Sequence, residues 1–521
     1  MSPGTPPPLP RRPSIAAWAA LAVALIVGFY TLTLALAAAC VYLPYLMFTS
    51  QHGAGIQVLF LLLSGVLMAG TMLWSLIPRR QKFTPPGPRL EAARHPRLFA
   101  EIHRLATSLN EPPPHEVYLI PEVNAWVAEP EGRGRRIMGL GLPLLQILTV
   151  SRFRAVLAHE FGHYYSGDTR LGPWVYKTRA AMVRTLLGLG RPSAVLKVLT
   201  RFLLVRAAYE VVTRVMMGYW NLFLRITQLI SRRQEYRADE LACAVAGSRA
   251  LIEGLQDIHR GAAALSAYLG ELGRALGAGY RPPIAQGFSL FMAAGDIHEA
   301  LEAYLVKELA HPQTRPFDSH PPLRDRLLAA GRLPPGDDPQ NDHPAISLLE
   351  DVTSLEAQLL QKLNPKRNIG SLKLAPWEDI GHTVYVPGWR KYTEEYAELL
   401  AGVTVGSLPE KVKSLSGMGS HIRDPKGMLL TREQRAQRAA DLLAAGFSLA
   451  LIDSGWDLHA QPGEFHLQRG TEQLQPFHII RELASAKLTG QAWLERTQAL
   501  SIEHLLLGPN QTPDVPKGLT A

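Results

Sequence analysis

The chain has 521 residues, with 54 Lys and Arg against 45 Asp and Glu, a formal net charge of +9 and a pI near 9.5. It is longer than one ordinary domain, so we expect two or more units. No nucleic-acid-binding motif and no alternation of basic with aromatic residues accompanies the charge, so a nucleic-acid partner is not expected. Two cysteines, Cys40 and Cys243, provide neither a disulfide framework nor a Cys-x-x-Cys metal site.

Two long apolar segments follow the proline-rich residues 1–14, which we expect to be disordered. Residues 15–48 and 56–77 contain no charged residue, and each is long enough to cross the hydrocarbon core as a helix. They predict a transmembrane hairpin over residues 15–78. A cleaved signal peptide is the alternative for the first segment, but its apolar part is too long for one and leads into a second span.

Basic residues flank this hairpin on one side only, with Arg11 and Arg12 before it and Arg79, Arg80 and Lys82 after it. The positive-inside rule therefore predicts that both ends of the hairpin face the cytoplasm. We expect a multi-pass protein of the cell (inner) membrane whose following domain is cytoplasmic.

A small sheet is predicted next. After an amphipathic helix at 90–110, three short strands at 117–120, 124–129 and 135–141 are separated by proline or glycine turns.

The segment that follows, residues 157–168, reads LAHEFGHYYSGD and contains His159, Glu160 and His163 as His-Glu-x-x-His. On an α-helix, positions i and i+4 lie on one face, so both imidazoles can reach one metal ion. Glu160 projects toward the same pocket as a candidate proton acceptor. The surrounding residues predict a helix with Ser151 as its N-cap.

A small sheet ahead of such a helix is the usual setting of a zinc peptidase, in which an edge strand pairs with an extended substrate. We therefore expect Asn124, Ala125 and Trp126 to contact the substrate, with a purely supporting sheet as the alternative. Asp168 is expected to support the metal ligands, although Ser-Gly-Asp also fits a helix-ending turn.

Residues 172–230 are apolar but interrupted by charges, and from Arg206 onward the polar positions lie within about a third of a helical wheel. Interfacial helices and additional membrane spans both fit, and we favour interfacial or packed helices because buried arginines are costly in hydrocarbon. The same stripe continues to Glu235 and Asp239. Glu235 could complete a His-His-Glu zinc site, and Asp239 could accept the free N–H of a ligand histidine. Alone, such a pair is more typical of a solvated helix face.

The chain resembles the integral-membrane zinc metallopeptidases of the HtpX and CAAX prenyl protease type, which are gluzincins. The matching elements are NAW at 124–126, LAHEFGH at 157–163, SRRQEYRAD at 231–239 and SHPPLRDRL at 319–327. The resemblance covers residues 15–330 and implies a zincin-type catalytic domain at 88–330.

The resemblance also implies residue roles. His159, His163 and Glu235 would bind one Zn²⁺, and Glu160 would be the catalytic base. His320 and Arg326 would stabilise the anionic intermediate.

A zinc ion held by such ligands lowers the pKa of a bound water toward about 7. Glu160 is expected to take the proton of this water as it attacks the scissile carbonyl, and to pass it to the leaving amine. The predicted function is a membrane-bound zinc metalloendopeptidase that acts on protein or peptide substrates in or near the lipid bilayer, in quality control or processing. A catalytically inactive membrane scaffold with a vestigial metal site is the alternative.

The remainder is predicted to contain a linker and helix at 331–372, a separate α+β module at 373–508 and a disordered tail at 509–521. VYVPGW and the stretch 455–470 are predicted strands, the latter a hairpin at Pro462-Gly463, and residues 431–451 and 482–500 are predicted helices. His459 and His466 face each other on this hairpin, where a structural or exposed pair is more common than a metal site. The predicted fold class is α+β and predominantly helical.

Overall fold

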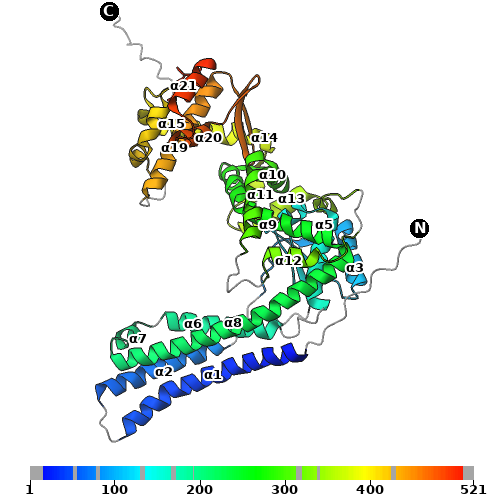
Figure 1. Ribbon diagram of the computed structural model, residues 1–521, viewed down its shortest axis with the longest axis vertical. Helices are drawn as coiled ribbons and strands as arrows, with labels where there is room; N and C mark the ends of the chain where they lie inside the picture. Colours follow the sequence, from blue (N-terminus) through cyan, green and yellow to red (C-terminus); the bar gives the residue numbers. More distant parts are fainter. Residues whose placement is uncertain are drawn as a thin grey trace, which may run out of the picture. The chain divides into compact units, whose positions relative to one another are not determined.

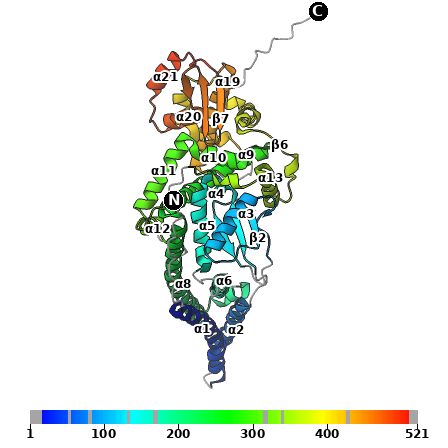
Figure 2. The same ribbon diagram turned by 90° about the vertical axis from the view of Figure 1, so that its right-hand side faces the viewer.

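The structure is a computed structural model that describes residues 16–50, 55–77, 83–129, 135–165, 172–191, 193–312, 320–336, 341–423 and 430–508. The chain forms two compact units, with Met1–Arg260 and Tyr304–Val352 in unit 1 and Gly261–Ala303 and Thr353–Ala521 in unit 2. Both are mainly helical with small sheets (Figure 1, Figure 2), which confirms the predicted fold class. The boundaries between these two units lie at other positions than the boundaries of the predicted domains.

Unit 1 begins with two apolar helices, α1 (Ala16–Thr49) and α2 (Ile56–Leu76). Among the described helices, these two are long and apolar enough to cross a membrane, in agreement with the predicted hairpin. They pack closely at Gly65 of α2. The carbonyl oxygen of Cys40 in α1 occupies the position that a side chain at residue 65 would need. α1 continues through Pro44 to Thr49.

Three further helices pack on α1 and α2, namely α6 (Gly172–Gly190), α7 (Ala194–Leu199) and α8 (Leu203–Ala246). α1, α2, α6 and α8 share an apolar core that includes Phe29, Met68, Met72, Met182, Met216, Trp220 and Phe223. α8 has 44 residues, so it is about 66 Å long at 1.5 Å per residue. It leaves this helical bundle and continues into the part of unit 1 that carries the sheet (Figure 1).

That sheet has four strands in the order β1-β2-β4-β3. β2 (Glu116–Ile120) and β4 (Ile137–Gly141) are parallel and almost wholly buried, as is typical of a sheet covered on both faces. β1 (Arg89–Leu90) and β3 (Ala125–Ala128) are the two edges, and each is antiparallel to its neighbour. β2, β3 and β4 correspond to the three predicted strands.

Helix α5 (Val150–Tyr165) follows the sheet and buries Phe153, Leu157 and Phe161, which are spaced at helical intervals. The Thr149 side chain accepts a hydrogen bond from the backbone N–H of Arg152, three residues on, so Thr149 is the N-cap. The predicted N-cap, Ser151, is wrong: it lies in the first turn, and its backbone N–H donates to Asp342.

The other elements of unit 1 are α3 (Pro96–Ser108), α4 (Leu142–Ile147), α12 (Leu323–Ala330) and η2 (Ala345–Leu348). Helices α9 (Ser248–Gly277) and α11 (Gly295–Ala310) begin in one unit's residue range and end in the other's.

Unit 2 has its own core, formed by α19 (Arg432–Asp453) and the antiparallel sheet of β7 (Asp457–Gln461), β8 (Glu464–Arg469) and β9 (Glu472–Leu474). α19 starts with a capping box between Thr431 and Gln434. Besides the elements described in the next two paragraphs, unit 2 contains β5 (Tyr280–Arg281), α10 (Ile284–Ala293), α13 (Val352–Leu363), η3 (Ile369–Ser371), β6 (Lys373–Leu374), α14 (Trp377–Ile380), α16 (Ala397–Leu400), α17 (Leu408–Lys411), η5 (Val412–Ser414), α18 (Leu415–Met418) and η6 (Gly419–His421).

The hairpin predicted at Pro462-Gly463 is confirmed, with Gly463 at a φ of +77°. The strand predicted at VYVPGW is wrong, because these residues belong to η4 (Gly381–Tyr385) and α15 (Val386–Glu395). A proline in the first turn of a helix loses no hydrogen bond, so VYVPGW fits a helix start.

The helix predicted at 482–500 is instead two helices, α20 (Pro476–Ala484) and α21 (Gly490–Ala499). The chain turns at Ala486, which has a φ of +58°, and the Thr489 side chain caps α21.

The close contact of α5 with α8 yields a stability prediction. A methyl group at Gly162 would lie 2.8 Å from the Cα of Ala238, whereas one at Gly273 of α9 would meet nothing within 4 Å. Gly162→Ala should therefore lower the thermal unfolding midpoint, at a cost of about 1–3 kcal/mol for overpacking. Gly273→Ala, the matched control, should raise it through about 0.5–1 kcal/mol of helix propensity. Equal midpoints in a thermal melt of the purified variants would contradict the close helix contact.

Candidate metal centre

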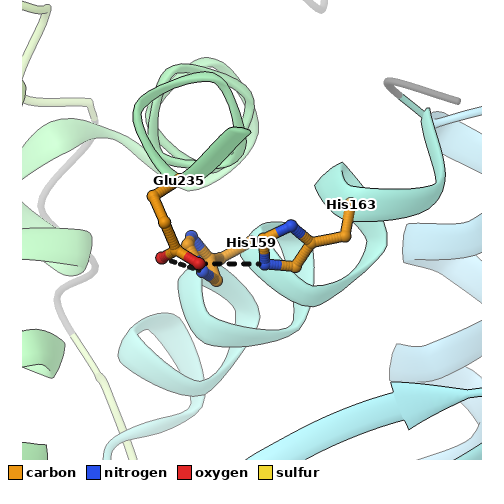
Figure 3. A group of neighbouring side chains, drawn as sticks. All are labelled: His159, His163 and Glu235. Carbon is orange, nitrogen blue, oxygen red and sulfur yellow. Dashed lines mark ion pairs between the residues drawn. The ribbon is translucent and has the colours of Figure 1, made fainter. Parts of the chain in front are cut away.

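Two histidines of α5, His159 and His163, place their rings on the side of the helix that faces α8 (Figure 3). They are one turn apart, with ring centroids separated by 4.9 Å and ring planes nearly perpendicular. His159 is buried and His163 is half-buried. The helix thus holds both imidazoles next to one point in space.

Glu235 reaches this point from α8. Its Oε2 lies 3.5 Å from Nε2 of His159 and its Oε1 lies 3.7 Å from Nε2 of His163, so the predicted ligands come together. Donor atoms of the three residues lie within 4.8 Å of one another, and no second such group exists in the described part of the chain.

The donor set fits a zinc ion. Glu235 is 4% exposed, and its Oε2 makes no hydrogen bond to a described residue, although Nδ1 of His320 is 2.7 Å away. A buried carboxylate oxygen without a hydrogen bond, facing two imidazole nitrogens, needs a positive partner. Two nitrogens and one carboxylate are ligands that Zn²⁺ commonly takes in catalytic sites.

The two histidines differ in proton affinity. Burial lowers the pKa of His159, but its hydrogen bonds with Asp239 and Glu235 outweigh burial and raise it to about 9. Burial and the neighbouring His159 lower the pKa of His163 to about 4. Burial disfavours the charged form of Glu235, yet the adjacent imidazoles of His159 and His320 keep its pKa well below the ordinary range. His159 is therefore the more basic of the two imidazoles of α5.

Asp239, one turn after Glu235 on α8, supports His159 from behind. Its Oδ1 lies 2.9 Å from Nδ1 of His159, and with a proton on Nδ1 the ring donates to Asp239 and turns Nε2 toward Glu235. Arg326 of α12 grips the same carboxylate, with Nε donating to Oδ2 at 2.9 Å and Nη2 to Oδ1 at 2.6 Å. Burial opposes ionisation of Asp239, but the hydrogen bonds with Arg326 and His159 lower its pKa.

Glu160 adjoins His159 on α5 and is half-buried. Burial raises its pKa to about 7, against the opposing effect of the neighbouring His159. A carboxylate with a pKa near the working pH is suited both to accept and to release a proton. The arrangement therefore combines a candidate metal site with a candidate general base.

His320 and Arg326, predicted to stabilise an anionic intermediate, both lie on the Glu235 side of the site. The His320 side chain is 61% exposed, with Nδ1 2.7 Å from Glu235 Oε2. Two nitrogens of Arg326 are committed to Asp239, and Nη1 lies 3.8 Å from Glu235 Oε2. Sequence reasoning missed the bond between Arg326 and Asp239, although a carboxylate beside a buried histidine needs a positive partner.

The predicted substrate residues lie at the sheet edge. Asn124 is exposed just before β3, and Ala125 and Trp126 begin that strand, which is paired only with β4 in the described residues. The indole of Trp126 occupies the position that a side chain at Gly139 of β4 would need. The substrate role of these residues stays a prediction, and Asp168 lies outside the described residues.

The two histidines of the unit 2 hairpin are cross-strand neighbours. His459 pairs with His466, and their rings stack with centroids 5.0 Å apart. Oε1 of Glu464 lies 3.4 Å from Nδ1 of His466, but the described residues around the pair do not form a close group of three possible metal ligands. The structural or exposed role that the sequence favoured for this pair stays a prediction.

Parts of the chain are similar to known proteins. Residues 92–333 match Peptidase family M48. Protease HtpX of Pseudomonas putida (strain GB-1) is 28% identical over 223 residues, which are 42% of this chain and 65% of that protein. Protease HtpX of Xylella fastidiosa (strain M12) is 28% identical over 217 residues, which are 41% of this chain and 64% of that protein. The chain thus spans about 65% of the length of these curated relatives. Residues 92–333 therefore resemble the domain of Peptidase family M48, and the chain is similar to the HtpX proteases over part of its length.

Proposed function

We propose that this protein is a membrane-bound, zinc-dependent endopeptidase that acts on membrane or membrane-proximal proteins. The observation that carries the proposal is the meeting of His159 and His163 of α5 with Glu235 of α8. Glu160 stands beside these ligands with a pKa raised by burial. A quality-control or processing role is proposed from the similarity to the HtpX proteases.

His159, His163 and Glu235 would hold the zinc ion. Bound there, zinc would polarise the scissile carbonyl and increase the acidity of a water molecule. Glu160 would accept the proton of the attacking water and deliver it to the amide nitrogen as the C–N bond breaks, so that a free amine and a carboxylate result.

The surrounding residues would position these groups. Asp239 holds the Nδ1 proton of His159 and thereby fixes the ring orientation, and Arg326 holds Asp239. The free edge of β3 would pair with an extended substrate backbone near Trp126. An exposed His320 could donate a hydrogen bond to the substrate carbonyl oxygen.

α1 and α2 would anchor the enzyme in the membrane, since each is long and apolar enough to span it. The basic residues that flank these two helices in the sequence favour a cytoplasmic catalytic domain.

Replacing the general base should separate chemistry from metal binding. In Glu160→Gln, we expect unchanged zinc content and a loss of about 10²–10⁴-fold in the cleavage rate of a denatured protein substrate, because the amide cannot accept a proton. The exposed Glu240→Gln serves as the control and should keep full activity. Undiminished cleavage by Glu160→Gln would reject the mechanism. Absence of zinc-dependent cleavage by the wild-type protein would favour the scaffold alternative.

Replacing the carboxylate ligand should instead remove the metal. Glu235→Gln is expected to lose most of its zinc, measured by atomic absorption after gel filtration, because a neutral amide is a poor zinc ligand. Glu240→Gln, five residues further along the same helix, should retain it. Full zinc occupancy in Glu235→Gln would exclude Glu235 as a ligand.

Zinc affinity should depend on pH in a defined sense. Zinc binds neutral imidazole, and His159 holds its proton up to a pKa of about 9 in the metal-free site. Between about pH 7 and 9 the apparent affinity, measured by chelator competition, should rise about tenfold per pH unit and then level off. Asp239→Asn removes a group that raises this pKa, so its plateau should begin at lower pH. A pH-independent affinity would contradict the proton held at His159.

A further inference from the structure

The helices α6 and α8 lie alongside α2 over most of its length. Near the C-terminal end of α2, the hydroxyl groups of Ser75 and Thr185 are 2.5 Å apart. Near its N-terminal end, Leu61 packs against Leu199 and Val205. Leu61 and Ser75 are about 14 residues apart, or about 21 Å along the helix.

The turn between α6 and α8, which contains α7, therefore lies at the end of the bundle where α1 and α2 are joined (Figure 1). The rings of Phe60 in α2 and Phe202 before α8 are 4.7 Å apart, which places the turn at the same level. We call the described residues 191 and 193–206 the tip. If α1 and α2 span the bilayer, the tip reaches the leaflet opposite the cytoplasm.

The tip is rich in cations, and three of them have no acidic partner among the described residues. Arg191, Lys197 and Arg201 are exposed, and none has an ion pair with a described residue. Arg206 pairs with Glu210, which also pairs with Arg214. Residues 172–230 contain nine Lys and Arg and a single acidic residue, Glu210.

Exposed apolar side chains alternate with these cations. Val195 and Val198 are 53% and 54% exposed, and Leu203 is 80% exposed. Water disfavours such side chains, and hydrocarbon disfavours the cations between them. A surface that mixes both kinds matches the boundary between acyl chains and anionic head groups.

The depth of the tip allows this placement. Leu61 is about five residues, or about 7.5 Å, from the end of α2 at Ile56. Lys197 and Arg201, which flank Leu199 in the sequence, can extend their side chains from this level to the head groups while their aliphatic stems stay in the apolar region.

We propose that the tip binds the phosphate groups of anionic phospholipids, with Arg191, Lys197 and Arg201 as the binding cations. The excess of positive charge selects an anionic over a zwitterionic lipid, and the exposed Val195, Val198 and Leu203 contact its acyl chains. The proposal is independent of the peptidase function, because none of these residues belongs to the metal centre.

The test uses the full-length protein purified in mixed micelles that contain equal amounts of phosphatidylglycerol and phosphatidylcholine with identical acyl chains. Native mass spectrometry then counts the lipids that each protein retains. The wild-type protein should retain phosphatidylglycerol preferentially. The triple variant Arg191→Gln, Lys197→Gln, Arg201→Gln should lose about fivefold or more of this preference, as expected for removing phosphate contacts at the membrane surface.

The control variant Lys362→Gln, Lys366→Gln, Lys413→Gln removes the same charge from exposed positions of unit 2 and should keep the preference. An equal loss in both variants would show a general charge effect and overturn the proposal, as would a wild-type protein without preference. Should the tip variant not fold, the wild-type protein still provides the test, because the preference must weaken as NaCl rises from about 0.1 to 1 M. A preference that inorganic phosphate abolishes at constant ionic strength would indicate a free-phosphate site instead.

Discussion

The contact between α5 and α8 is so close at Gly162 and Ala238 that a methyl group on Gly162 would meet the backbone of α8. This contact places His159 and His163 opposite Glu235, because all three lie within about one turn of it. Ligand distances on the scale of a zinc–nitrogen bond tolerate little error. The smallest residue at the crossing is therefore a requirement of the metal centre as well as of packing.

A buried set of charges surrounds that contact. Asp239 is 2% exposed and Arg326 6%, and they form a bidentate pair that also holds His159. Buried ion pairs add little net stability, because removing both charges from water costs about as much as their attraction returns. Their value here is geometric. The carboxylate of Asp239 in α8 contacts His159 of α5 and Arg326 of α12, and it thereby orients three helices that are distant in sequence.

Much of this site could be predicted from local spacing. His-Glu-x-x-His fixes two ligands and a base on one helical face, and a polar stripe that runs along α8 points to Glu235 and Asp239. The pairing of Arg326 with Asp239 could not be predicted in this way, because it depends on how α12 packs against α8. A resemblance can assign Arg326 a role in the reaction, but only tertiary structure shows that two of its nitrogens are already occupied.

The errors have equally local causes. Thr149 and Ser151 both suit an N-cap, and the choice depends on Asp342, which is far away in sequence and binds the Ser151 amide. VYVPGW contains β-branched and aromatic residues typical of strands. Its proline nevertheless lies in the first turn of α15, where proline is favoured, and the segment is helical. By contrast, the 44-residue helix α8 runs without a break from the apolar insertion into the ligand segment, as expected from the polar stripe that continues to Asp239.

That continuity has a practical consequence for protein engineering. Helices α6 and α7 and the first part of α8 lie between His163 and Glu235 in the chain, so trimming either terminus cannot yield a water-soluble fragment with a complete ligand set. Deleting α1 and α2 would merely uncover the apolar faces of α6 and α8. A soluble version would require an internal excision and a short linker that restarts α8 at the correct rotation, so that its carboxylates still face α5.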